Sequence, residues 1–110
     1  MKEHESTEKR LDDFRQLEEN HIFPFLREEF GVIHTAYLLY NAIDQGVDIY
    51  AYLVNSKSVI EFDVSIKDNS IIKNEIITVE EYAKSIQGKG KDNLASRNRL
   101  KALLKKSISQ

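Results

Sequence analysis

The sequence predicts an α+β fold with helices at the N-terminus, an antiparallel meander in the middle and two C-terminal helices packed on the sheet. Three patterns lead to this prediction. Apolar residues recur at helical spacing before Pro24, residues 59–66 alternate between apolar and polar, and a helix-start signature begins at Thr78. A chain of 110 residues is expected to have one hydrophobic core, so we predict that residues 1–110 form a single domain.

The N-terminal part reads as two helices. Leu11, Phe14 and Leu17 follow one another at three-residue steps, which predicts an amphipathic helix over residues 8–19. Pro24 then sets a boundary, because proline is tolerated in the first turn of a helix but not in its interior. A short second helix is expected over residues 24–30, ending at Gly31 in a left-handed cap.

Residues 32–45 fit two patterns. A helical stripe runs along the segment, and Gly46 stands where a helix terminator belongs; the stripe consists of Ile33, Ala36, Tyr37, Tyr40 and Ile43. However, residues 32–37 are also rich in residues that favour strands. We predict a helix here, which leaves a three-stranded meander; a strand at this position would make the sheet four-stranded.

The strands after Gly46 are better defined. Residues 49–54 are apolar on both faces, and residues 59–66 place Ile60, Phe62, Val64 and Ile66 on a dry side and Glu61, Asp63 and Ser65 on a wet side. Turns are expected at residues 55–57 and 68–70, followed by a third strand over residues 71–77. We expect the helices to dock onto the dry side, because so small a sheet needs cover on its apolar face.

Two helices are predicted at the C-terminus. Thr78 and Glu81 have the spacing of a capping box, and Ile77 and Tyr82 occupy the hydrophobic staple positions around it, so a helix should begin here and end by Gly88. A last helix should run from Asp92 or Asn93 to about Lys106.

Composition limits the class of protein. The chain has no cysteine, so the fold cannot depend on disulfides or on a zinc-thiolate site. No apolar run approaches the roughly 20 residues of a membrane-spanning helix, and residues 1–10 lack the apolar core of a secretory signal. These features predict a cytoplasmic protein with no membrane partner.

Charge is distributed unevenly. Residues 82–110 carry eight basic side chains and one acidic one, a net charge of +7, whereas residues 1–81 carry −9. The basic segment offers candidate anion-binding residues, and these are Lys89, Lys91, Arg97, Arg99, Lys101 and Lys105. The glycines at 88 and 90 lack the spacing and the Lys-Ser/Thr pair of a phosphate-binding loop, which favours a hinge.

The acidic part and the tyrosines offer candidates for contact with another protein. Tyrosine is favoured at protein interfaces, and carboxylates complement a basic partner. The candidate interaction residues are Glu18, Glu19, Glu28, Glu29, Tyr50 and Tyr52. The three histidines match no metal motif and have no identifiable catalytic partners, so the sequence predicts no catalytic residue, no metal ligand and no cofactor.

Three functions are compatible with these patterns. The leading hypothesis is a small bacterial-type inhibitor, immunity or antitoxin-like protein, not an enzyme, that masks a protein partner through charge complementarity. The alternative is a nucleic-acid-associated regulator that uses the basic C-terminal loop and helix. A second alternative is a small metal-dependent hydrolase or nuclease with Asp48, Glu61 and Asp63 as ligands and Lys67 nearby.

Overall fold

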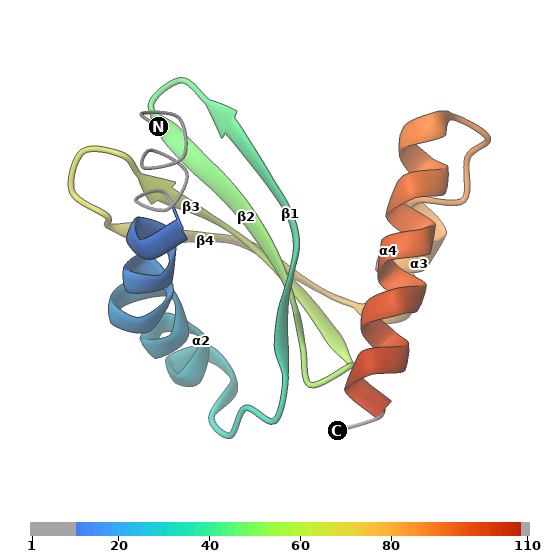
Figure 1. Cartoon of the computed structure of the whole chain (residues 1–110), viewed down its shortest axis with the longest axis horizontal. Helices are drawn as coiled ribbons and strands as arrows, with labels where there is room; N and C mark the ends of the chain where they lie inside the picture. The colour runs from blue at the N-terminus through green and yellow to red at the C-terminus, as the bar shows by residue number, and fades with distance from the viewer. Residues whose placement is uncertain (1–10, 109–110) are drawn as a thin grey trace, which may run out of the picture. The chain divides into compact units, whose positions relative to one another are not determined.

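The computed structural model describes residues 11–108, and its contacts divide the chain into two compact units, residues 1–32 and 33–110. The first unit is helical, and the second contains a sheet and two helices (Figure 1). The fold is therefore α+β, as the sequence predicts. Within the described residues, no helix has the length and apolar character needed to span a bilayer.

The first unit forms one uninterrupted helical run over residues 11–30. An α-helical stretch at residues 11–17 leads into a π-helical turn, η1 (Glu18–Ile22), and then into helix α2 (Phe23–Phe30). Pro24 lies in the first turn of α2, and the wider π-helical turn before it gives room to the proline ring. The predicted boundary is thus a local change of helix type. Gly31 follows the end of α2 as predicted and has a positive φ of 74°, but its ψ of −113° lies outside the left-handed helical region, so the predicted left-handed cap is wrong. Residues 8–10 of the first predicted helix lie outside the described residues.

The second unit is built on a four-stranded antiparallel sheet. Its strands are β1 (Ala36–Asp44), β2 (Val47–Val54), β3 (Ser58–Ser65) and β4 (Ile71–Thr78), and they lie side by side in chain order (Figure 1). The predicted turns are confirmed. Asn55 and Ser56 have positive φ between β2 and β3, and the Asp68 carboxylate accepts a hydrogen bond from the Ser70 amide, 3.0 Å away, between β3 and β4.

The helix predicted within residues 32–45 is wrong, because this segment contains β1. Gln45 and Gly46 both have positive φ, 46° and 85°, and Asp44 pairs with Val47, so the two residues form the tight turn of a β1–β2 hairpin. Gly46 is one of two residues with positive φ in that turn and does not end a helix. The local sequence fits a helix and a strand almost equally well, and hydrogen bonding to β2 makes this segment a strand.

Both edge strands carry a β-bulge. The β1–β2 register shifts between Leu38 and Tyr40, which leaves Leu39 as an extra residue in β1. On the other edge, Glu75 pairs with Glu61 and Lys73 pairs with Phe62, which leaves Asn74 as an extra residue in β4. A bulge reverses the alternation of side chains beyond it, so these two positions decide which residues share a face of the sheet.

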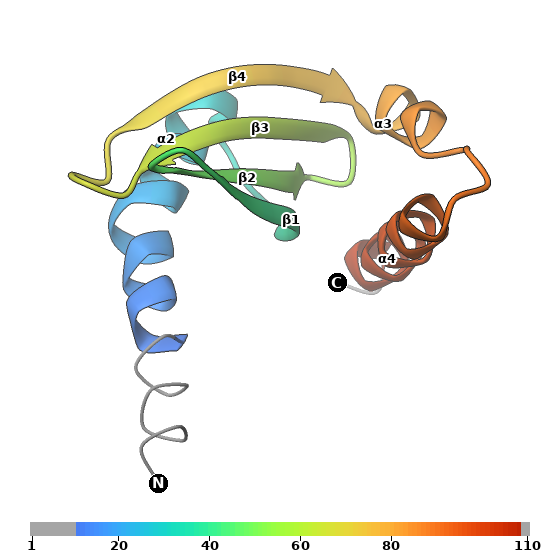
Figure 2. The ribbon, with the colours of Figure 1, turned by 90° about the horizontal axis from the view of Figure 1, so that it is seen from above.

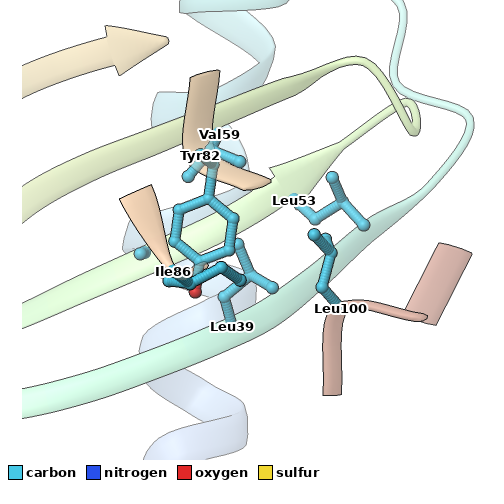
Figure 3. Packing of buried hydrophobic residues seen from close by; sticks show 7 residues of the cluster. Leu39, Leu53, Val59, Tyr82, Ile86 and Leu100 are labelled. Carbon is cyan, nitrogen blue, oxygen red and sulfur yellow. The ribbon is translucent and has the colours of Figure 1, made fainter. Parts of the chain in front are cut away.

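Helices α3 (Val79–Ser85) and α4 (Lys91–Ile108) pack on one face of the sheet, at the end where β4 runs into α3 (Figure 2). The capping box is confirmed: the Thr78 hydroxyl accepts from the Glu81 amide at 3.1 Å, and the Glu81 carboxylate accepts from the Thr78 amide at 3.2 Å. Strand and helix side chains converge in one cluster (Figure 3), which consists of Leu39, Ala51, Leu53, Val59, Tyr82, Ile86 and Leu100.

The predicted docking face is wrong for these two helices. They cover the face that carries Leu53 and Val59, whereas Ile60, Phe62 and Val64 lie on the opposite face of β3. The reason is that β2 is apolar on both faces and can support a core on either one. Ile66 is 57% exposed, because β3 ends at Ser65 and Ile66 belongs to the following turn.

Candidate protein interface

Two of the predicted anion-binding residues are committed to backbone contacts. The Arg97 guanidinium donates to the carbonyl oxygens of Ile86 and Gly88, at 2.7 and 2.8 Å, and so ties α4 to the end of α3. The Arg99 guanidinium donates to the carbonyl oxygens of Leu39 and Leu38, at 3.0 and 2.6 Å, beside the β1 bulge. Both arginines act as structural donors to backbone carbonyl oxygens, and those that Arg99 bonds lie where the bulge disturbs the pairing of β1.

The other predicted anion-binding residues are lysines with exposed side chains, and these are Lys89, Lys91, Lys101 and Lys105. Lys106, which the sequence did not single out, places its ammonium 5.0 Å from the centre of the Tyr37 ring, within the range of a cation–π contact. The basic segment therefore contains basic side chains that hold α4 in place, together with lysines that are exposed at the surface.

The predicted acidic contacts in the first unit differ in accessibility. Glu19 and Glu28 are exposed, whereas Glu18 and Glu29 are half-buried. The two exposed carboxylates belong to different helix types, Glu19 to η1 and Glu28 to α2.

The prediction that Tyr50 and Tyr52 are exposed for a partner is wrong. Tyr50 is 5% exposed and Tyr52 is fully buried, and both rings stack on Phe62, with ring centres 5.9 and 5.8 Å apart. Register places all three residues on the same face of β2 and β3, where the rings form one aromatic layer. These tyrosines belong to the core.

The three carboxylates of the metal-site hypothesis do not come together. Asp48 pairs with Val64, and Asp63 pairs with Ile49, so the Asp48 side chain lies on the opposite face of the sheet from Glu61 and Asp63. Among residues 11–108, no group of three or more histidine, aspartate or glutamate side chains is placed to hold a metal ion. The geometry gives the metal-dependent hydrolase no support.

Glu61 and Asp63 instead join a polar cluster with side chains from both edge strands. The Tyr40 hydroxyl donates to the Glu61 carboxylate, and the Asn74 amide donates to Asp63 at 2.7 Å and to Glu61 at 3.5 Å. Both of these donors are neutral, so the bonds orient the carboxylates without cancelling their charge. Glu75 adds a third carboxylate, since it pairs with Glu61 across β3 and β4.

The cluster lies on the same face as α3 and α4, on the part of the sheet that these helices leave uncovered. We call this surface the open half-face; it consists of Tyr40, Glu61, Asp63, Ile72, Asn74 and Glu75. Tyr40 is 37% exposed and Ile72 is 66% exposed, so apolar surface flanks the carboxylates. An exposed mixture of aromatic, aliphatic and acidic groups is suited to binding another macromolecule.

The same geometry argues against acid–base chemistry by Tyr40. Burial, followed by the hydrogen bond and the negative charge of Glu61, raises the pKa of the Tyr40 hydroxyl above its usual value. The hydroxyl therefore stays protonated at neutral pH and acts as a hydrogen-bond donor, not as a base.

Sequence reasoning missed four members of the open half-face, which are Tyr40, Ile72, Asn74 and Glu75. Tyr40 was placed in a helix, whereas Asn74 reaches the carboxylates only because the β4 bulge turns it toward them. Ile72 appeared only as part of a strand. The alternation of β3 did identify Glu61 and Asp63 as neighbours on one polar face, and that signal was correct.

Comparisons with protein-family models, with curated protein sequences and with solved structures found no match to this chain.

Proposed function

We propose that this chain is a small cytoplasmic protein-binding accessory, of the inhibitor, immunity or antitoxin type, that masks a basic protein partner through charge complementarity. The open half-face is the observation that carries this proposal. It presents three carboxylates beside exposed Tyr40 and Ile72, and the bonded groups on Glu61 and Asp63 are neutral donors. The proposal is of a binding protein, not of an enzyme.

The chemistry of the surface favours a protein partner over a nucleic acid. Phosphate backbones are repelled by carboxylates, and nucleic-acid binding depends on neutralising phosphates with cations. Exposed apolar groups with an acidic fringe match a basic protein surface instead, because aromatic and aliphatic anchors supply affinity while charges supply orientation and rate. In the first unit, the exposed Glu19 and Glu28 also favour a basic partner.

The partner can be captured from the source cells on the immobilised chain, identified by mass spectrometry and then purified. Titration of the purified partner against the wild type and against the double variant Glu61→Gln/Asp63→Asn should show weaker binding by the variant, about tenfold at low salt. A second variant that neutralises Glu18, Glu19, Glu28 and Glu29 measures the share of the helical carboxylates. Partner binding that neither variant changes would end the charge-masking proposal.

A nucleic-acid-associated regulator is the second candidate, and the exposed Lys89, Lys91, Lys101 and Lys105 favour it. It predicts that DNA or RNA binding weakens steeply as salt is raised and as these lysines are replaced by glutamine. The committed contacts of Arg97 and Arg99 reduce the number of cations that can neutralise phosphates. Absence of binding at low salt would remove this candidate.

A further inference from the structure

We infer that the open half-face receives a basic amphipathic α-helix of the partner protein, which lies on the sheet next to the chain's own α4. This inference rests on the proposed function and specifies the partner's structure. It follows from the incomplete helical layer on the sheet, from the blocked edges of the sheet and from the spacing of the carboxylates.

The helical layer on this face of the sheet is incomplete. Leu53 and Val59 are buried beneath α3 and α4, but farther along the edge strands on the same face, Tyr40 of β1 and Ile72 of β4 keep 37% and 66% of their surface exposed. Sheets normally bury an apolar face against helices or a second sheet. A further helix on the open half-face would complete the layer that α3 and α4 begin (Figure 2).

The chain shows which kind of helix this face accepts. α4 packs through a narrow apolar edge, in which Leu100 is buried and Leu103 and Leu104 are partly buried, and it carries basic side chains along its length. Arg99 reaches from that helix to the carbonyl oxygens of β1. A partner helix with a similar leucine edge and basic flanks would meet Tyr40 and Ile72 with its leucines and the carboxylates with its cations.

An added strand is a poorer occupant, because both edges of the sheet are irregular. The bulge at Leu39 interrupts β1, and Arg99 already bonds the carbonyl oxygens at that point. The bulge at Asn74 interrupts β4 near the middle of the strand. Bulged edges resist pairing with another strand, so the face of the sheet is the available docking surface and not its edge.

Spacing supports a helical partner in particular. Glu61 and Asp63 are two residues apart on β3, which separates them by about 6.5 to 7 Å along the strand. Residues four apart on an α-helix are separated by about 6 Å along its axis. A helix that runs along β3 can therefore place basic side chains at positions i and i+4 over these two carboxylates.

The test uses the full chain and a designed 18-residue peptide of alanine and leucine with lysines at paired i and i+4 positions. The control peptide has the same composition and charge but alternates L- and D-residues, which prevents an α-helix. Binding is measured by fluorescence anisotropy at about 20 mM salt, where screening is weak. The chain variants are Glu61→Gln/Asp63→Asn and a charge-matched control, Asp48→Asn/Glu80→Gln, whose residues lie on the other face and on α3.

The expected result is that the helical peptide binds, that the control peptide does not, and that only Glu61→Gln/Asp63→Asn weakens binding, about tenfold. Amide chemical shifts of the wild type should then change at Tyr40 and Ile72, which keeps the test valid if the double variant fails to fold. Equal binding of both peptides, with equal loss in that variant, would overturn the helix and leave the masking function standing. Absence of binding by either peptide, or helical-peptide binding that the variant leaves unchanged, would overturn both.

Discussion

Arg99→Ala is the sharpest test of how the sheet and the last helix are joined. The substitution removes two hydrogen bonds, from Nε to the Leu39 carbonyl oxygen and from Nη2 to the Leu38 carbonyl oxygen, at 3.0 and 2.6 Å. A hydrogen bond from a charged donor contributes roughly 1.5 to 3 kcal/mol when it is buried. The bond to Leu39 is partly buried and the bond to Leu38 is exposed, so we expect a loss of about 2 kcal/mol in the free energy of unfolding.

Urea unfolding followed by circular dichroism measures this loss, and thermal unfolding should show a midpoint lower by about 8 °C. Lys101→Ala is the matched control, because it removes one positive charge from an exposed position on the same helix, and its effect should stay within about 0.5 kcal/mol. Arg99→Lys keeps the charge but loses the fork of donors, so its stability should fall between the two. If Arg99→Ala and Lys101→Ala destabilise the chain equally, the guanidinium does not hold α4 to the bulge.

Three further outcomes are expected. The pKa of Tyr40 is raised in the folded chain, so the unfolded chain loses this proton first and the unfolding free energy should fall as the pH rises above about 10; since Tyr40 is 37% exposed, solvent screening makes this fall shallower than the full linkage slope, and Tyr40→Phe should flatten it in urea titrations between about pH 9 and 11. Thr78→Ala removes the hydroxyl that accepts from the Glu81 amide and keeps the backbone N–H that donates to the Glu81 carboxylate; it should cost about 1 kcal/mol in urea unfolding, whereas a cost below about 0.3 kcal/mol would deny the hydroxyl a stabilising role. Leu53→Ala creates a cavity in a fully buried position and should cost about 3 kcal/mol by the same assay, with a value under about 1 kcal/mol contradicting the core assignment.

The elements that the sequence predicted well are those whose signals are local. The capping box needs only Thr78 and Glu81, which lie three positions apart and bond each other, and it is present as predicted. The alternation in β3 is also local, and it separated Phe62 from Glu61 correctly. By contrast, residues 36–44 satisfy a helical and an extended pattern, and pairing with β2 decides between them. The turn that makes this pairing possible, at Gln45 and Gly46, lacks the Asn-Gly signature that marks such hairpins most clearly.

The candidate site depended on contacts that no local pattern encodes. The sequence grouped Asp48, Glu61 and Asp63 as metal ligands. Glu61 and Asp63 do share a face of the sheet, but side chains alternate along β2, and Asp48 lies on the opposite face. Asn74 joins Glu61 and Asp63 because of a bulge, and bulges have no reliable sequence signature. The role of Arg99 depends on carbonyl oxygens 60 and 61 positions earlier in the chain, so charge alone made it look like an anion-binding residue.

These contacts change how the uneven charge of the chain is interpreted. Within the basic segment, Arg97 and Arg99 bond backbone carbonyl oxygens and Lys106 lies over an aromatic ring, so part of its charge serves the attachment of α4. On the open half-face the relation is reversed, because Glu61 and Asp63 are held by a hydroxyl and an amide that leave their charge in place. Cations of a partner can therefore pair with two carboxylates that are already oriented by hydrogen bonds. Since orienting a charged group in advance lowers the entropic cost of binding, the acidic side of this polarised chain is the better prepared for a partner.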